Sequence, residues 1–202
     1  MVGDGTVGTN SSGDALLKTS GKAGSCVALI SPGKYSAEVI EAKLYFPALP
    51  GKSGTIANWT SFWLTDNRAG PSTGELDAVE AEPADGVNAV SWHSGTTAKP
   101  FAASTDGLFP AKLPVDSPNL TPGRHIVDVV YTRGFFAVYY DGRKYTHYAS
   151  GNVTGDPLNI YLSTAVTPDV SAVREEIGGP PVNSDSSAAT VAVKYLRVWS
   201  YR

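Results

Sequence analysis

The sequence predicts an all-β protein, built as a sandwich of two antiparallel sheets. Its 202 residues, 42% of them hydrophobic, suffice for one well-packed domain over residues 1–202. The 21 glycines and 14 prolines alternate with many short runs rich in Val, Tyr and Thr. Short β-forming runs between frequent turns are typical of all-β folds. We therefore expect many short strands in a single domain.

The first quarter of the chain predicts three strands. Its N-terminal part is rich in Gly, Ser and Thr, and Ala15–Thr19 is the one strand candidate there. A second strand is expected over Cys26–Ser31, closed by a turn at Pro32-Gly33. A long strand follows over Tyr35–Phe46, with a local irregularity near Val39-Ile40.

Two tryptophans mark the strand expected over residues 59–64. Trp59 and Trp63 share one face, and Phe62 and Leu64 share the other. Because Phe62 and Leu64 already supply a core face, we interpret the two indoles as a sugar-binding surface. Aromatic rings pack on the C–H-rich faces of pyranoses and leave an N–H to reach a hydroxyl. The alternative is that both tryptophans belong to the core.

Three acids lie close together in Gly74–Glu82, namely Glu75, Asp77 and Glu80. Side chains alternate between the faces of a strand, so Glu75 and Asp77 point one way and Glu80 points the other. One extra residue at Ala78-Val79, a β-bulge, would return Glu80 to the face of the other two acids. A helix would instead spread the acids around its circumference. We therefore predict a bulged strand with all three acids on one face.

This arrangement suits the hydrolysis of a glycosidic bond. With the bulge, the Cα atoms of Glu75 and Glu80 are roughly 13 Å apart, and on a concave sheet their side chains lean together. Their carboxyls then approach the roughly 5–5.5 Å separation of a retaining glycosidase. One glutamate would be the nucleophile, and the other, kept protonated by its neighbours, the general acid and then base. Asp77 can share a proton with an adjacent glutamate and separate the two pKa values. The alternatives are a solvated acidic face and a calcium site.

The strand expected next, over Val87–Ser94, carries a histidine. Ser91 and His93 share one of its faces. If this strand pairs with the acidic strand, His93 lies near Glu80 or Asp77, and we include it among the candidate substrate-binding residues. The alternative is a structural hydrogen-bonding role.

The second half of the chain is rich in hairpin signals. Thr96–Pro122 is long for a loop, and such a segment is usually functional or contains short strands. His125–Tyr140 predicts two strands around Thr132-Arg133-Gly134, and Asp141-Gly142 is a strong hairpin signal. Further strands are expected over Lys144–Tyr148, Leu158–Ala165 and Ala189–Tyr201.

The acidic strand resembles the active-site signature of glycoside hydrolase family 16. Glu75-Leu76-Asp77-Ala78-Val79-Glu80 matches its bulged form, Glu-x-Asp-x-x-Glu, and Trp59-Thr60-Ser61-Phe62-Trp63-Leu64 is similar to the family's Trp-Pro-Ala-Phe-Trp-Leu strand. The resemblance covers roughly residues 33–202 in family order. Other segments that resemble the family are Tyr35–Lys43, Arg124–Tyr145 and Val193–Trp199.

Two positions depart from the family's pattern. Lys43 stands where the family usually has Arg, and Lys lacks the bidentate fork. The usual Gly-Gly-x-Trp segment appears only as Gly178-Gly179-Pro180-Pro181, which leaves one sugar-stacking position without its tryptophan.

The resemblance implies a jelly-roll, concanavalin A-like sandwich whose concave sheet forms an open cleft. It implies an endo-acting retaining hydrolase of β-1,3- or mixed-linkage β-1,3(4)-glucan. In this assignment Glu75 is the nucleophile, Glu80 the acid/base, and Asp77 tunes the pair. The alternatives are a galactan substrate such as agar or carrageenan, and a non-catalytic, lectin-like module that binds polysaccharide on the same sandwich.

The composition indicates where the protein acts and which partners it binds. A formal charge of −3 gives no sign of nucleic acid or an anionic membrane as partner, and no apolar run approaches about 20 residues. Low charge with plentiful Ser, Thr, Asn and Gly is typical of secreted carbohydrate-active proteins, so we expect a secreted monomer whose partner is a polysaccharide. No phosphate-binding loop or Cys/His cluster occurs, so we expect no cofactor and no catalytic metal; a structural calcium stays an open alternative. The lone Cys26 excludes an internal disulfide, and we expect a buried apolar role for it because it lies far from the acids along the chain.

Overall fold

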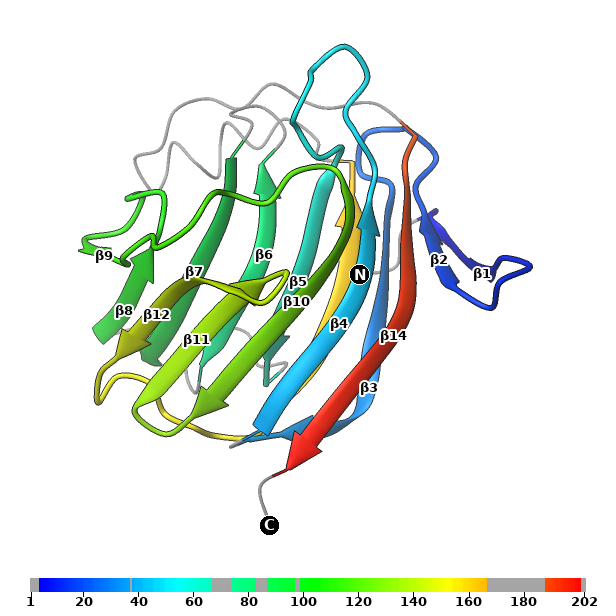
Figure 1. The fold of residues 1–202 in the computed structure, drawn as a ribbon. Coiled ribbons are helices and arrows are strands. Elements are labelled where there is room, and N and C mark those ends of the chain that lie inside the picture. Colours follow the sequence, from blue (N-terminus) through cyan, green and yellow to red (C-terminus); the bar gives the residue numbers. More distant parts are fainter. Residues whose placement is uncertain are drawn as a thin grey trace.

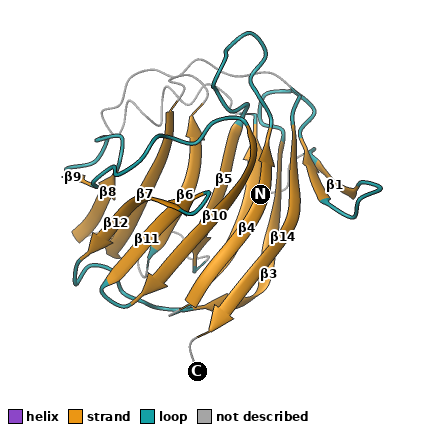
Figure 2. Ribbon diagram, in the orientation of Figure 1, coloured by secondary structure: helices purple, strands orange, loops and turns teal. Residues whose placement is uncertain are grey.

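Two seven-stranded sheets pack face to face in the computed structural model (Figures 1 and 2). The structure describes residues 4–36, 38–66, 74–82, 87–96, 99–166 and 188–200. The outer sheet runs in the order β1 (Thr6–Thr9), β2 (Ala15–Lys18), β14 (Thr190–Ser200), β4 (Glu38–Phe46), β10 (Gly123–Thr132), β11 (Phe135–Tyr140) and β12 (Arg143–Ala149). The inner sheet runs in the order β3 (Cys26–Tyr35), β13 (Leu158–Ala165), β5 (Trp59–Thr65), β6 (Glu75–Glu82), β7 (Val87–Thr96), β8 (Lys99–Ser104) and β9 (Ala111–Lys112). The predicted all-β jelly-roll sandwich is confirmed, with one parallel pair, β8 and β9.

The core lies between the two sheets and is filled by alternate residues of the strands. Phe62 and Leu64 of β5 are fully buried there, as their shared face predicts. Trp92 of β7 is also fully buried, and its indole N–H donates to the carbonyl of Asn152 at 3.1 Å. Burial of each such large apolar side chain stabilises the fold by about 1.5–3 kcal/mol. The opposite face of the inner sheet is therefore free to carry polar residues.

The predicted turn at Pro32-Gly33 is wrong, because β3 continues through these residues to Tyr35. Proline cannot donate to a strand ladder, but β3 is an edge strand whose described pairing is with β13 alone. The register with β13 shifts here, and the side-chain amide of Asn159 donates to the carbonyls of Ser31 and Gly33 at 3.3 and 3.2 Å. β3 ends at Tyr35, and β4 begins at Glu38.

Three short strands were not predicted from the sequence. All four residues of β1 are exposed and β1 pairs only with β2, so its sequence shows no alternation of buried apolar and exposed polar side chains. β8 and β9 lie inside the long segment expected over Thr96–Pro122. That segment thus contains strands, one of the two outcomes expected for a stretch of this length.

β14 changes face part-way along its length. Simple alternation would keep Val193 and Trp199 on one side, but the register with β4 shifts between Val193 and Tyr195. Val193 is therefore buried, whereas Trp199 is 46% exposed on the outer sheet and Val198 packs against the core instead.

The hairpin at Asp141-Gly142 forms as predicted between β11 and β12. Both residues have positive φ, 52° and 75°, as a type I′ turn requires.

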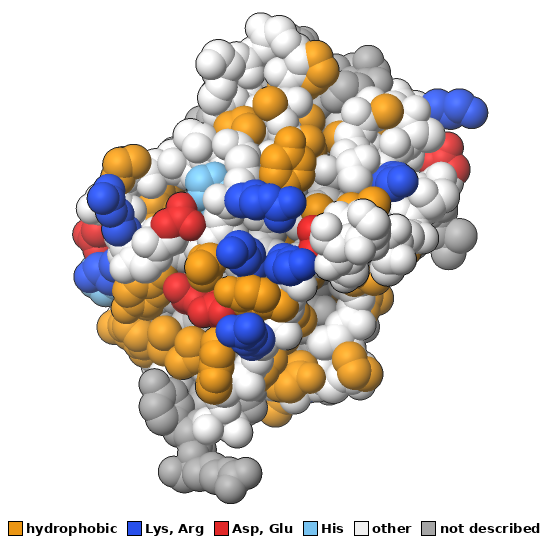
Figure 3. All heavy atoms as spheres, turned by 45° about the vertical axis from the view of Figure 1, so that its right-hand side comes forward, with side chains coloured by type: hydrophobic (Ala, Val, Ile, Leu, Met, Phe, Trp, Pro, Cys, Tyr) orange, Lys and Arg blue, Asp and Glu red, His pale blue; other side chains and the backbone are white. Residues whose placement is uncertain are grey.

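The surface carries side chains of both charges. On the face shown in Figure 3, several Lys and Arg side chains gather near the middle, with acidic and apolar side chains around them. Within the described ranges, no helix is long and apolar enough to cross a membrane.

Candidate active site

The predicted bulge is present in β6 and brings the three acids to one face of the inner sheet. Against β5, Trp63 pairs with Asp77 and the next residue back, Phe62, pairs with Val79, so Ala78 is the extra residue. Against β7, the step of three positions from Asp77 to Glu80 lies opposite a step of two positions, from Ser91 to Ala89. Glu80 thereby regains the orientation of Asp77 and Glu75.

Two residues that the sequence did not single out hold the bulge in place. The hydroxyl of Tyr140 reaches across from the outer sheet and donates to the Ala78 carbonyl at 2.7 Å. The side-chain oxygen of Asn88 accepts from the Glu80 N–H at 3.1 Å, and its amide donates to Tyr140 at 2.8 Å. Backbone groups that the bulge removes from the ladder are thus satisfied, which fixes the position of Glu80.

A cleft of about 540 Å³ lies over the inner sheet beside these acids. It is floored by β6, β5, β13 and β3, which are neighbours in that order. Both sequence-predicted tryptophans and all three acids line it. These five lining residues are Trp59, Trp63, Glu75, Asp77 and Glu80.

Trp63 forms a fixed half-buried platform in this cleft. Its ring packs against Tyr161 of β13, with centroids 4.5 Å apart, and its indole N–H donates to Ser163 Oγ at 3.1 Å. The expectation that this N–H would reach a sugar hydroxyl therefore does not hold for Trp63, because Ser163 already accepts it. What the residue offers to the cleft is its aromatic surface.

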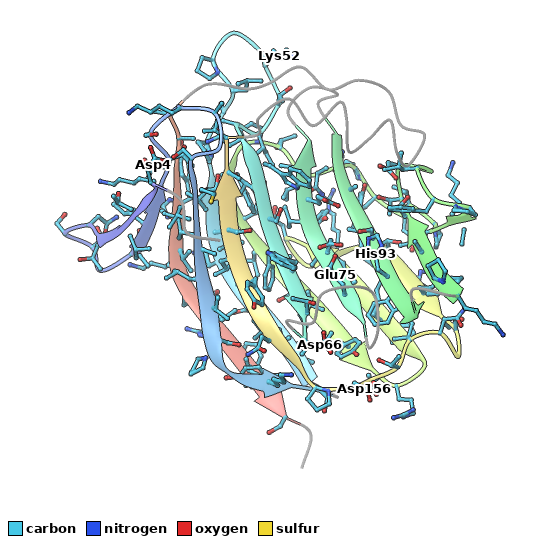
Figure 4. The ribbon with its side chains drawn as sticks, turned by 180° about the vertical axis from the view of Figure 1, so that it is seen from behind. Asp4, Lys52, Asp66, Glu75, His93 and Asp156 are labelled. Atoms are coloured by element: carbon cyan, nitrogen blue, oxygen red, sulfur yellow. The ribbon has the colours of Figure 1, made fainter. Side chains whose placement is uncertain are left out.

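His93 lies beside the acids but is not among the cleft-lining residues. It pairs with Glu75 across β6 and β7, and its Nε2 is 3.6 Å from Asp77 Oδ2. Figure 4 shows Glu75 and His93 side by side in the middle of the inner sheet. The expected closeness to Asp77 is confirmed, and a substrate-binding role for His93 stays a prediction.

Ser91, opposite Asp77 on β7, links the aspartate to the histidine. Its hydroxyl donates to Asp77 Oδ2 at 2.6 Å, and its oxygen is 3.1 Å from His93 Nε2. The imidazole also packs edge-on against Phe109, with ring centroids 4.8 Å apart. Sequence alternation placed Ser91 on the correct face, but only the register with β6 shows its partner.

The sequence matches no protein-family model and no curated protein, whereas many solved structures share the fold. A glycoside hydrolase family 16 endo-glucanase from Bacteroides ovatus is 13% identical, with a TM-score of 0.67 over 96% of this chain and 85% of that one. The laminarinase catalytic domain from Thermotoga maritima is 15% identical, with a TM-score of 0.64 over 98% and 82%. A kappa-carrageenase from Zobellia galactanivorans is 16% identical, with a TM-score of 0.63 over 98% and 82%.

The chain has the glycoside hydrolase family 16 fold. At these identities the likeness concerns architecture, and the chemistry of the site depends on its own residues.

On this family 16 fold, the buried acids have strongly shifted proton affinities. Burial raises the pKa of Glu75 to about 7, and the adjacent Asp77 carboxylate adds to this rise. Burial raises the pKa of Asp77 to about 6, opposed by the hydrogen bond from Ser91. Burial also lowers the pKa of His93, so the imidazole is neutral at neutral pH. Paired acids with raised pKa values are typical of sites that exchange protons.

Glu75, Asp77 and His93 bring one polar atom each within 4.8 Å of one another. The imidazole nitrogen that faces the acids is engaged with the Ser91 hydroxyl, and that hydroxyl is engaged with Asp77. Within the described part of the chain we therefore interpret this cluster as a hydrogen-bonded proton site, and a structural calcium stays untested.

Cys26 lies closer to the site than the sequence suggested. It is half-buried at the start of β3 and lines the same cleft as the acids. Separation along the chain misled the prediction, because β13 joins β3 to β5 and so brings residue 26 into the cleft wall.

The raised pKa values of Glu75 and Asp77 predict that ionisation of these acids lowers the free energy of unfolding as pH rises. Because the folded state holds these protons more tightly than the unfolded chain, the contribution of these two acids to stability is highest near pH 4 and is lost as pH rises through about 6 and 7. Glu75→Gln removes this cost, which is about 3 kcal/mol at most, since one pKa unit corresponds to about 1.4 kcal/mol. We expect its melting temperature to exceed that of the wild type by several degrees at pH 8 and to match it near pH 4.

Asp77→Asn should likewise have a higher melting temperature than the wild type at pH 8. Asp128 on the outer sheet also has a raised pKa, caused by burial and then by Glu41, but it is unchanged in these variants and cancels in the comparison. Melting curves across pH 4–8 test the prediction, and a variant that is less stable than the wild type at pH 8 would contradict it.

Proposed function

We propose that this protein is an endo-acting, retaining glycoside hydrolase whose substrate is a β-1,3- or mixed-linkage β-1,3(4)-glucan. One observation carries the proposal: the bulge of β6 gathers Glu75, Asp77 and Glu80 on the floor of a cleft that also holds Trp59 and Trp63. A nucleophile, a proton donor and a stacking surface are what such a reaction needs.

In the first step, a carboxylate oxygen of Glu75 attacks the anomeric carbon of the bound sugar. The bond from that carbon to the glycosidic oxygen breaks, and Glu80 gives its proton to the departing oxygen. The products are a sugar ester of Glu75, an ionised Glu80 and a released chain end.

In the second step, Glu80 takes a proton from a water molecule, whose oxygen attacks the anomeric carbon. The ester bond to Glu75 breaks, both glutamates return to their starting states, and two inversions leave the configuration retained. Asp77 lies between the two glutamates in sequence, and its negative charge opposes the ionisation of Glu75, so the protonation state of Asp77 influences when Glu75 is free to attack.

The cleft supports an uncharged substrate. Among its described lining residues there is no Lys or Arg to pair with sulfate groups. A neutral glucan fits such a lining better than a sulfated galactan, although a kappa-carrageenase is among the similar structures. The platform of Trp63 on Tyr161 suits the flat, apolar face of a pyranose ring.

The proposal also covers the location, oligomeric state and partner of the protein. We infer that the protein acts outside the cell as a monomer, on a polysaccharide partner and without a cofactor, as its low charge and polar composition suggest.

Hydrolysis of a panel containing laminarin, mixed-linkage glucan, agar and carrageenan tests the proposal. We expect internal cleavage of the glucans, with the β-anomer as the first product in a proton NMR time course. First-formed α-anomer would contradict retention. Binding to a glucan without cleavage of any polymer in the panel would instead favour a lectin-like module.

A further inference from the structure

The Ser91 hydroxyl contacts two titratable side chains. Its side chain is 1% exposed, and its oxygen lies within 3.1 Å of both Asp77 Oδ2 and His93 Nε2. A serine hydroxyl has one hydrogen to donate and lone pairs to accept. At 2.6 Å, the contact with Asp77 has the length of a hydrogen bond from a hydroxyl to a charged oxygen.

The network has a definite direction when Asp77 is ionised. An ionised carboxylate can only accept, so Ser91 donates its hydrogen to Asp77. The serine oxygen then accepts from His93, which places the imidazole hydrogen on Nε2. His93 thus aims the serine hydroxyl at the aspartate.

We propose that Ser91 is a positioning residue that holds Asp77 in its ionised form and thereby makes Glu75 the last of the two acids to ionise. A buried donor stabilises the charged form of the acid it contacts. The negative Asp77 then opposes the ionisation of Glu75, which lies two residues away on the same face of β6. Under the proposed function, Ser91 therefore sets the lower pH limit of activity.

Other groups in the described part of the chain also act on Glu75. Asp66, just after β5, also opposes the ionisation of Glu75, while His93 on β7 favours it and the Thr65 hydroxyl favours it through a hydrogen bond. Glu80 shares the face on β6 and lines the same cleft. Replacing Ser91 leaves all these residues in the chain but removes the hydrogen-bond acceptor of His93, so the titration of His93 has to be followed beside those of the two carboxyls.

Ser91→Ala tests the inference directly. Loss of one hydrogen bond to a charged group should lower the acid dissociation constant of Asp77 about tenfold. Glu75 then ionises beside a neutral carboxyl and does so at lower pH. Carbon-13 NMR of the two labelled carboxyls, with pH titration of the ligand-free protein, measures both effects without any substrate.

The kinetic readout follows from the same change. We expect the acidic limb of the kcat/KM profile of Ser91→Ala to move to lower pH, with a lower maximum because Asp77 is no longer held in place. Ser91→Thr keeps the hydroxyl and should restore the wild-type limb. Ser91→Cys, a weaker donor of similar size, should move the limb in the same direction as alanine but by less.

A matched control comes from the same strand. Ser94→Ala removes another buried serine hydroxyl from β7, three residues further on and on the opposite face, and should leave both carboxyl titrations unchanged. A merely structural role for Ser91 would lower activity at every pH without moving the limb, and unchanged titrations in Ser91→Ala would overturn the inference. If the titrations move as expected but no polysaccharide is cleaved, the proposed function fails and the link from Ser91 to Asp77 stands.

Discussion

Alanine in place of Glu75 should lower hydrolysis by at least about a thousandfold, because no covalent sugar ester can form without the nucleophile. Azide should then restore part of the turnover of an activated aryl glycoside. It attacks the anomeric carbon directly, from the side that Glu75 occupied, and gives an α-glycosyl azide. The proton donor Glu80 is still present in this variant and can assist the departing oxygen.

Glu80→Ala should lower hydrolysis for a different reason, the loss of the proton donor. The nucleophile remains, so activated aryl glycosides, whose leaving groups need little protonation, should react far better than polysaccharide. Azide should intercept the covalent intermediate and give a β-glycosyl azide, since two displacements have then occurred. One NMR spectrum of the azide product from each variant thus assigns both roles.

Glu41→Gln provides the control for the loss of a carboxylate elsewhere. Glu41 lies on β4 of the outer sheet, away from the cleft, and its replacement should leave turnover unaltered. If the two azide products are exchanged between the variants, the roles of the two glutamates are reversed. Wild-type turnover in both variants would end the assignment of β6 as the catalytic strand.

The sequence was informative about the face on which each side chain of β5 and β6 lies. Both faces of these strands are constrained, one by the core and one by the cleft, so a period of two is visible in residues such as Phe62 and Trp63. The bulge at Ala78 was predictable for the same reason, because without it Glu80 would be forced into the core. Turn chemistry placed the hairpin at Asp141-Gly142 equally well.

The contacts between strands were not accessible in this way. Tyr140 supports the bulge from the other sheet, and Ser91 meets Asp77 only because β6 and β7 pair in one particular register. Neither residue has a local sequence signal, since each acts on a partner far along the chain. Pro32 and Cys26 misled for a related reason: their interpretation depends on β3 being an edge strand that β13 joins to the cleft.

The role of Trp63 is open to a test in which other tryptophans of the chain serve as controls. Trp63 lines the cleft, Trp92 is fully buried in the core, and Trp199 is 46% exposed on the outer sheet. Trp92→Ala should lower stability by about 3–5 kcal/mol, because it leaves a large cavity in the core. Trp199→Ala should change neither melting temperature nor turnover by much, because surface substitutions usually stay within about 0.5 kcal/mol.

Trp63→Ala should reduce kcat/KM on glucan by about tenfold to a hundredfold, while the melting temperature falls by only a few degrees. Removing the indole abolishes the stacking surface. A ring stacked on an aromatic side chain contributes about 1–3 kcal/mol to binding, as for nucleic-acid bases stacked on aromatic residues. Some stability is also lost, because Tyr161 loses its ring partner and Ser163 loses its donor. Trp63→Phe keeps a ring in the cleft but not the N–H, so it should recover most of the activity if stacking is what matters. Kinetics on glucan beside melting curves separate the two contributions, and a Trp63→Ala protein that melts like Trp92→Ala yet retains full activity per folded molecule would place this indole in the core.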